Sequence, residues 1–285
     1  MLNGTPIKTA SGLTWNFFAN FTRTRGKVLE LTDELKTYSM TGRNGANIQA
    51  RVGERMGNIY GSGFARVADP ASPYFGQIIH TSTGTPTVDP TLKLQGNYNP
   101  DWMLGLQNNV SYKGLSLGFL FDYRHGGIVV SRTKTIGSTS GQLEETLYGR
   151  ENGYDITLPG NGIISEGVIK NGDGSFTPNT IKITSRNWHN RYYERNNVEA
   201  AKYDATFLKL REVTIGYTIP KKLLTRIPVQ DIKISLVGRN LALWTENPHF
   251  DPETMAMGGG TLIPGVEDMA IPSTRNIGFN LNIKF

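Results

Sequence analysis

The chain ends in the ten residues NIGFNLNIKF, positions 276–285, and this stretch decides the fold. Its odd positions are apolar, namely Ile277, Phe279, Leu281, Ile283 and Phe285, whereas its even positions hold Asn, Gly or Lys. Successive side chains of a β-strand point to opposite faces, so the segment is expected to have one apolar and one polar face. About ten residues is also the length that a strand needs to cross a bilayer. We therefore expect a membrane-spanning strand that ends at Phe285.

The same alternation recurs earlier in the chain. Lys113-Gly114 divides residues 102–124 into two apolar-polar strands, and a short connection that contains glycine is typical of a β-hairpin. Only Asn108 breaks the alternation in the first of these strands. With the less regular segments included, the sequence predicts about six long strands, near residues 13–23, 102–124 (two strands), 205–219, 231–245 and 275–285.

The connections between these strands differ greatly in length. Lys113-Gly114 and Pro220 to Gln230 are short, whereas the other three are long and rich in Gly, Asn, Thr and Pro, and cover residues 24–101, 126–204 and 246–274. Outer-membrane barrels alternate short periplasmic turns with long extracellular loops. Counted back from Phe285, this alternation predicts that both ends of the chain lie on the periplasmic side. Because a loop of this length is seldom structureless, we expect residues 46–66 to extend strands above the membrane.

Composition narrows the classes of protein. The 285 residues are 38% hydrophobic with a mean hydropathy of −0.34, and no apolar run is long enough for a transmembrane helix. The formal charge of +6 is spread along the chain, with no basic run longer than Lys221-Lys222, which argues against a nucleic-acid partner. Without cysteine there is no disulfide scaffold and no thiolate metal site. No signal peptide is visible after Met1, so either the chain is not exported or its natural N-terminus lies upstream.

A soluble β-sandwich that binds carbohydrate is the alternative for a chain of alternating strands. The length of the strands and the unequal connections favour a barrel instead. So do the aromatic residues at strand ends, which could form girdles at the membrane interfaces: Trp15, Trp102, Tyr112, Tyr123 and Trp244. The predicted fold class is therefore all-β, as the C-terminal part of a large antiparallel transmembrane barrel.

Several stretches resemble the SusC/RagA family, the TonB-dependent outer-membrane nutrient importers of Bacteroidetes. They are GNYNPDW at 96–102, SYKG at 111–114, DATFLKLREVTIGYTIP at 204–220, GRNLALWT at 238–245 and FDPE at 250–253. Each motif is weak alone, but their order and spacing are specific, and with the terminal strand they cover most of residues 96–285. The chain is thereby identified as similar to the C-terminal region of this family.

The resemblance implies a barrel of the 22-stranded type, with a signal peptide, a plug and further strands in addition to residues 1–285. It implies a function in importing glycans or peptides across the outer membrane. It also implies partners, namely a SusD-like surface lipoprotein, the TonB complex reached through the N-terminal part, and lipid with lipopolysaccharide around the barrel. The barrel-assembly machinery is a further partner, for which the terminal signal would be Phe279, Leu281, Ile283 and Phe285. Six strands cannot close a barrel, so we expect this chain to transport nothing alone.

One cluster in the second long connection is the best candidate for ligand contact. It comprises Trp188, His189, Arg191, Tyr192, Tyr193 and Arg195, in which stacking rings and charged donors suit a polar nutrient. A purely structural role in the loop is the competing interpretation. On the polar faces of the strands, Gln107, Asn109, Asn280 and Asn282 are expected to line the lumen.

No catalytic motif, cofactor motif or metal motif is recognisable, so we expect neither an enzyme nor a bound cofactor. The four histidines, His80, His125, His189 and His249, lie far apart in the sequence, with no acidic partner at the spacing of metal ligands. Residues 171–175, NGDGS, resemble a calcium loop but lack the glutamate expected near its twelfth position, which favours a solvated turn.

Overall fold

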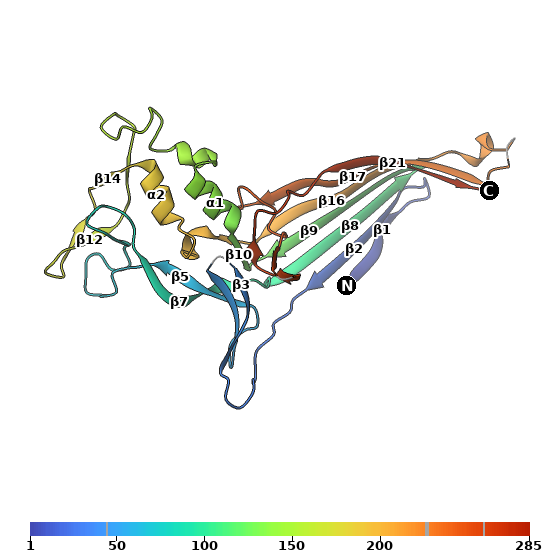
Figure 1. The fold of residues 1–285 in the computed structure, drawn as a ribbon. Coiled ribbons are helices and arrows are strands. Elements are labelled where there is room, and N and C mark those ends of the chain that lie inside the picture. The colour runs from blue at the N-terminus through green and yellow to red at the C-terminus, as the bar shows by residue number, and fades with distance from the viewer. Residues whose placement is uncertain (44, 226–227, 259) are drawn as a thin grey trace.

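The largest element of the computed structural model, which describes residues 1–43, 45–225, 228–258 and 260–285, is a seven-stranded antiparallel sheet (Figure 1). Its strands, in spatial order, are β1 (Leu2–Lys8), β2 (Thr14–Thr22), β8 (Trp102–Tyr112), β9 (Leu115–His125), β16 (Phe207–Thr218), β17 (Asp231–Thr245) and β21 (Asn276–Lys284). The six strands expected from the alternation are all present, and they pair antiparallel in their order along the chain. The fold is therefore all-β, as predicted.

The turn between β8 and β9 shows why the hairpin forms where it does. Lys113 and Gly114 both have positive φ angles, 46° and 89°, as a two-residue turn of the primed type requires. Tyr112 then pairs directly with Leu115, and the register continues without a bulge to Trp102 and His125. The connection from β16 to β17 includes positions 226 and 227, which lie outside the described residues.

Strand β1 was not predicted, and it corrects the expected position of the N-terminal end. It pairs antiparallel with β2, with a register shift between Gly4 and Ile7 that coincides with Pro6. Its sequence alternates poorly, and Pro6, which lacks a donor for the ladder, is accommodated at this register shift. Met1 therefore lies partway along the sheet, whereas Phe285 lies at the end with the short turns (Figure 1). The prediction that both chain ends share one side was wrong.

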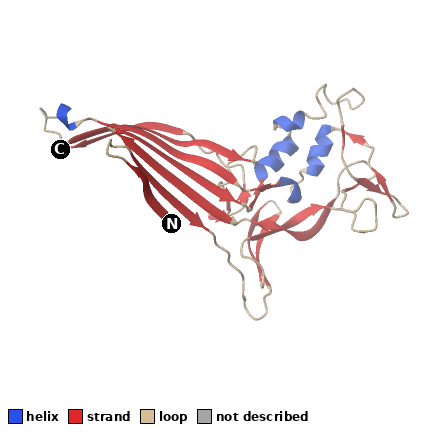
Figure 2. Ribbon diagram, turned by 180° about the vertical axis from the view of Figure 1, so that it is seen from behind, coloured by secondary structure: helices blue, strands red, loops and turns tan. Residues whose placement is uncertain are grey.

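The sheet is a single layer (Figures 1 and 2). Its register gives it one apolar and one polar face. The register places the apolar residues of neighbouring strands side by side, as in the row of Leu117, Ile215, Leu236 and Phe279. Phe279 remains 78% exposed, and within the described chain no second sheet packs on this face. The sandwich alternative is therefore wrong, because a sandwich would bury these residues against a second sheet.

Rings gather on the apolar face where the sheet meets the long connections. Trp102 stacks near Phe21 at 5.9 Å and near Tyr123 at 5.1 Å between ring centroids. All three lie near strand ends, and the sequence predicted this for Trp102 and Tyr123. Trp102 and Tyr123 each combine an apolar ring with a polar N–H or O–H, which suits the boundary between hydrocarbon and water.

Asn108, the residue that breaks the alternation, points to the apolar face of the sheet. It pairs with Phe17 on one side and Phe119 on the other, and it is largely buried. The indole Nε1 of Trp15 donates a hydrogen bond to its Oδ1 over 3.0 Å. A polar group in an apolar setting is costly unless it is hydrogen-bonded, so Trp15 makes Asn108 tolerable here.

Replacing Trp15 with phenylalanine is expected to destabilise the sheet by about 1–3 kcal/mol, because it leaves the Asn108 oxygen without its donor. Denaturant unfolding of the full-length protein in detergent, followed by circular dichroism, measures this loss. Adding Asn108→Leu to Trp15→Phe should restore most of the stability, since it removes the orphaned acceptor. If the double variant is less stable than Trp15→Phe alone, the role given to this hydrogen bond is wrong.

Beyond one end of the sheet, the three long connections fold together into a region that we call the cap, residues 23–101, 126–206 and 246–275 (Figure 1). Its largest sheet has the order β3 (Thr37–Arg43), β4 (Ala46–Arg51), β5 (Asn58–Phe64) and β7 (Val88–Asn97). The smaller sheets are β15 (Lys202–Asp204) with β10 (Ile128–Ser131) and β20 (Val266–Glu267); β13 (Phe176–Pro178) with β12 (Val168–Lys170) and β6 (Ile79–His80); β11 (Ile163–Ile164) with β14 (Lys182–Ile183); and β18 (Ala256–Gly258) with β19 (Thr261–Ile263). Strands β4 and β5 thus form part of a separate sheet. The prediction that residues 46–66 extend the long strands was therefore wrong.

The hydrophobic core cluster of the described residues lies in the cap, and Phe207, at the cap end of β16, is buried as well. Its members come from all three connections: Ala46, Ile48, Ile59, Val130, Val198, Ala201, Ala256, Ile263 and Val266. Residues 171–175 close the β12–β13 hairpin, where the Asp173 carboxylate accepts hydrogen bonds from the Ser175 backbone and hydroxyl. The three connections therefore fold as one body and not as independent loops.

Two short α-helices, α1 (Arg132–Ser140) and α2 (Ser185–Tyr192), pack side by side in the cap, together with the 3-10 turns η1 (Glu144–Leu147) and η2 (Glu199–Ala201) (Figures 1 and 2). A third 3-10 turn, η3 (Lys221–Leu223), follows β16. Helix α1 begins at Ser131, whose hydroxyl accepts from the Lys134 backbone and donates to the buried carboxylate of Glu267. Among the described residues, no helix is long and apolar enough to cross a membrane.

Candidate functional site

The polar face of the large sheet is the first candidate surface for function. The register sets Asn16 beside Asn109 in one part of the sheet, and Ser235 beside Asn280 in another. Next to these pairs, Gln107 and Asn282 line shallow depressions of about 470 and 410 Å³, respectively. The sequence predicted that Gln107, Asn109, Asn280 and Asn282 share a polar face, and the strand pairing places them there. Amide and hydroxyl groups in such rows can exchange hydrogen bonds with a hydrated, polar solute.

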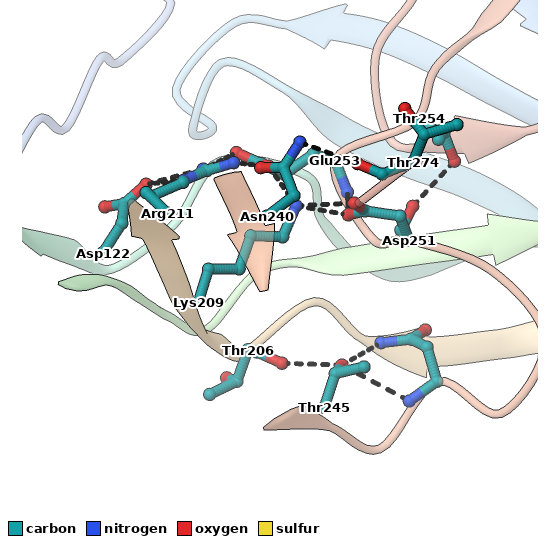
Figure 3. A network of polar contacts seen from close by, with 11 residues as sticks. Asp122, Thr206, Lys209, Arg211, Asn240, Thr245, Asp251, Glu253, Thr254 and Thr274 are labelled. Carbon is teal, nitrogen blue, oxygen red and sulfur yellow. Dashed lines mark hydrogen bonds and ion pairs between the residues drawn. The ribbon is translucent and has the colours of Figure 1, made fainter. Parts of the chain in front are cut away.

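A network of ion pairs crosses this face near the cap (Figure 3). The ammonium group of Lys209 donates to both carboxylate oxygens of Asp251, at 2.7 and 2.6 Å, and also to Glu253. The Arg211 guanidinium bridges Glu253, at 2.5 and 2.7 Å, and Asp122 on the neighbouring strand, at 2.6 and 3.1 Å. Lys209 is only 5% exposed. The network thus ties the connection that follows β17 to the wall of the sheet.

A β-bulge lies at Arg211, within the network. The pairing of β16 shifts at this residue against both of its neighbours. Against β9, Arg211 is an extra residue with no partner, whereas on β17 two residues, Asn240 and Leu241, oppose it. On β17 the same shift leaves Asn240 with a positive φ of 51°. Lys209 and Arg211 stand two positions apart and share the polar side by ordinary alternation, and the bulge turns Glu212 to that side as well.

The protonation of the two loop carboxylates follows from this geometry. Burial alone would raise the pKa of Asp251, but hydrogen bonds from Lys209 and from the Glu253 backbone lower it below its ordinary value. Burial likewise opposes ionisation of Glu253, and hydrogen bonds from Arg211 and Lys209 outweigh it, so its pKa is also lowered. Both carboxylates are therefore charged at neutral pH, which keeps the network intact.

Helix α2 and the residues just after it carry the predicted ligand cluster. Trp188 stacks on Tyr192 at 4.6 Å, and Tyr193 lies 6.0 Å from His189 with nearly parallel rings. Phe64 of β5 packs against Tyr192 at 4.7 Å, which joins the stack to the cap. These rings are partly or wholly buried in the cap and contact one another.

The remaining two members of the cluster face outward. Arg191 is exposed and lies 3.7 Å from Glu194, and Arg195 is also exposed. Arg191 lines a shallow depression of about 530 Å³ together with Thr83, Thr85 and Asn190. The structure therefore divides the six predicted residues into an inner aromatic stack and an outer basic rim.

The predicted terminal signal lies on the apolar face of β21. Phe279 and Leu281 pair with Leu236 and Ile234 of β17, and Ile283 pairs with Ile232. All three remain exposed, as does Phe285 after the strand ends. One edge of β21 is paired with β17 and the other is free within the described chain, as is one edge of β1.

The ion-pair network was missed by reasoning from sequence, although its residues lie in the quoted motifs. Lys209 and Arg211 stand two positions apart in a predicted strand, and Asp251 and Glu253 stand two positions apart in FDPE. This matched spacing was the available signal. Without the fold nothing indicated that the two pairs meet, because about forty residues separate them.

Comparison with known proteins adds to this picture. No family profile matches the chain. The TonB-dependent receptor P3 of Formosa agariphila is 23% identical over an alignment 302 residues long, which covers 97% of this chain and 27% of that receptor. The TonB-dependent receptor P26 of the same organism is 25% identical over 194 residues, which covers 67% of this chain and 17% of that receptor. The chain thus spans about a quarter of the length of receptor P3.

Solved structures of the RagAB peptide importer share the fold. The closed-closed state matches with a TM-score of 0.63 at 17% identity, over 99% of this chain and 28% of the importer chain. The open-open state matches with a TM-score of 0.64 at the same identity and coverage. The seven-stranded sheet and its cap therefore have the fold of part of a large barrel with its loops. These relatives are named as receptors and importers, not as enzymes.

Proposed function

Because the chain is a SusC/RagA-like relative of the TonB-dependent receptors of the outer membrane, we propose that residues 1–285 form the C-terminal part of an importer barrel with its outer loops. The observation that carries this proposal is the single-layer sheet with one exposed apolar face and one polar face. In a membrane the first face contacts lipid and lipopolysaccharide, and the second lines the lumen.

The free edges of β1 and β21 support a larger barrel. An unpaired strand edge in hydrocarbon leaves backbone donors and acceptors without partners, at a cost of several kcal/mol for each group. Both edges must therefore pair with further strands of the same barrel. In this proposal the terminal residues Phe279, Leu281, Ile283 and Phe285 form the signal for the barrel-assembly machinery, and the TonB complex acts through the part of the receptor that carries the plug.

The imported substrate is a polar oligomer, a glycan or a peptide. The amides and hydroxyls of the polar face support this class, and so do the exposed side chains of Arg191, on α2, and Arg195, just after it. In this proposal the two arginines and the edge of Trp188 contact the substrate, whereas His189, Tyr192 and Tyr193 hold the helix in place. A SusD-like surface lipoprotein would cover the cap side and deliver the substrate.

Replacing both Arg191 and Arg195 with alanine in the full-length receptor is expected to reduce uptake of the preferred oligomer about tenfold at limiting concentration, with the stability of the receptor unchanged. The reason is that both side chains are exposed and serve contact rather than packing. Uptake by cells that carry the variant, with a strain lacking the receptor as baseline, measures the effect. Lys170→Ala, an exposed charge on β12, is the matched control.

Membrane fractionation tests the location that the proposal requires. The full-length receptor should be recovered in the outer membrane, and its mobility on a gel should change on boiling, as that of a folded barrel does. Recovery in the soluble fraction would contradict the proposal. Normal uptake by the arginine variant would instead contradict only the part assigned to α2.

A further inference from the structure

A pocket of about 310 Å³ lies between α1 and α2, and neither Arg191 nor Arg195 is among the residues that line it. It is lined by the end of α1, the start of α2 and the turn after η1; its polar lining includes Ser138, Ser140, Thr146, Arg150, Ser185, Arg186 and His189. Its volume is at the lower end of the range of small-molecule sites. Helices α1 and α2 stand next to each other in both ribbon views (Figures 1 and 2).

The positive charge of this pocket is not balanced from within. Arg150 and Arg186 both line it, no acidic side chain does, and among the described residues neither guanidinium has an acidic ion-pair partner. Arg150 is half-buried and donates to the Gly141 carbonyl at 3.1 Å and to the Thr146 hydroxyl at 3.0 Å. These bonds hold it in place but leave its Nε, which is buried, without an acceptor. A buried charge is normally paired, so this arrangement calls for an anion.

Two further side chains in the lining are buried and unpartnered. His189 is 4% exposed and Ser138 is 1% exposed. Within the described part of the chain, both ring nitrogens of His189 and the hydroxyl of Ser138 lack a hydrogen-bond partner. Burial, then the charges of Lys134 and Arg150, lower the pKa of His189 to about 4, so at neutral pH its ring offers one donor and one acceptor. Buried polar groups without partners are rare in native proteins and point to a missing ligand group.

We propose that this pocket binds the oxyanion group, a carboxylate or a sulfate ester, of an acidic unit in the imported oligomer. Arg150 and Arg186 supply the charge, and Ser138 and His189 supply hydrogen bonds to the oxygen atoms. Arginine suits this role because its planar donor fork matches the two oxygens of such a group. The inference rests on the proposed import function for its biological meaning, but the binding site itself can be tested without transport.

The test is titration calorimetry on the purified full-length receptor in detergent with four probes: glucuronate, glucose 6-sulfate, N-acetylglutamate and glucose. At least one of the three anions should bind, and glucose should bind at least about tenfold more weakly, because it lacks the charge. The pattern among the anions separates a uronate, a sulfated sugar and an acidic peptide as the source of the group. Failure of all three anions to bind would overturn the proposal.

The variants Arg150→Gln and Arg186→Gln should each weaken binding of the anion about tenfold, whereas Lys170→Gln, an exposed charge elsewhere in the cap, should not. Arg150 also bonds to the backbone, so its loss could disturb folding. Arg186 is exposed and its variant should fold normally, so Arg186→Gln decides the matter. Unchanged binding to the Arg186 variant would refute the site, even where the receptor imports normally. Anion binding that depends on Arg186, in a receptor that imports nothing, would uphold the site and contradict the import function.

Discussion

Replacing Lys209 with methionine is expected to detach the connection after β17 from the sheet wall, at a cost of about 3–5 kcal/mol in its local stability. Lys209 is buried and holds both oxygens of Asp251, which is itself largely buried. Removing the cation leaves the Asp251 carboxylate desolvated and without its partner. Arg211 would still hold Glu253, so the loss concerns one of the two ties.

Limited proteolysis of the full-length receptor in detergent, with cleavage sites mapped by mass spectrometry, measures this loss. Since each 1.4 kcal/mol is a factor of ten, cleavage within residues 246–275 should accelerate by about 100-fold or more if opening limits it. Lys233→Met, on the polar side of β17 and without a described ion pair, is the matched control. Adding Asp251→Leu should recover much of the protection, because an apolar pair can replace a buried ion pair. Equal cleavage of Lys209→Met and Lys233→Met would show that the tie is unimportant.

Replacing Leu281 with arginine is expected to prevent stable assembly of the barrel, whereas the same change at the next residue, Asn282, should be tolerated. The two side chains lie on opposite faces of β21, and Leu281 pairs with Ile234 on the apolar face. An arginine near the middle of the lipid-facing surface of a barrel costs about 2–4 kcal/mol, falling toward the interfaces. On the lumen side the charge remains hydrated.

The folded fraction in outer-membrane preparations, taken from gel mobility without boiling, measures the difference. Because the variants differ only in which face carries the arginine, expression level and total charge are matched. A similar folded fraction for both would mean that the two faces do not meet lipid and water, and would contradict the membrane role of the sheet. A loss with Asn282→Arg alone would reverse the assignment of the faces.

The long strands could be predicted from the sequence because each carries its own two-residue periodicity. Strand β1 could not, since with Pro6 and a bulge it has little periodicity, and only its backbone pairing with β2 defines it. Asn108 was recognised as an exception, but its hydrogen-bond donor, Trp15, lies 93 residues away. In each case the missing information was a contact between segments that are distant in sequence.

The candidate sites were even harder to predict from the sequence, because they are formed by contacts between distant segments. The α2 cluster was recognisable as a group of rings and charges, yet its division into a buried stack and an exposed rim came from packing against Phe64 and the rest of the cap. The pocket beside His189 needed α1, which brings Ser138 and, through the following turn, Arg150 to a helix more than thirty residues later. Nothing in residues 132–154 alone indicated that an uncompensated arginine would meet a buried histidine.

By itself, then, the sequence determined the class of the protein, its six long strands, and which residues of those strands are apolar or polar, because side-chain alternation is a local property that needs no partner. Only the tertiary structure decided that the three long connections form one cap, that Lys209 and Arg211 hold Asp251 and Glu253, and that α1 and α2 enclose a basic pocket. Those features arise from burial and charge pairing between distant segments, and their energies exist only once the chain has brought the segments together.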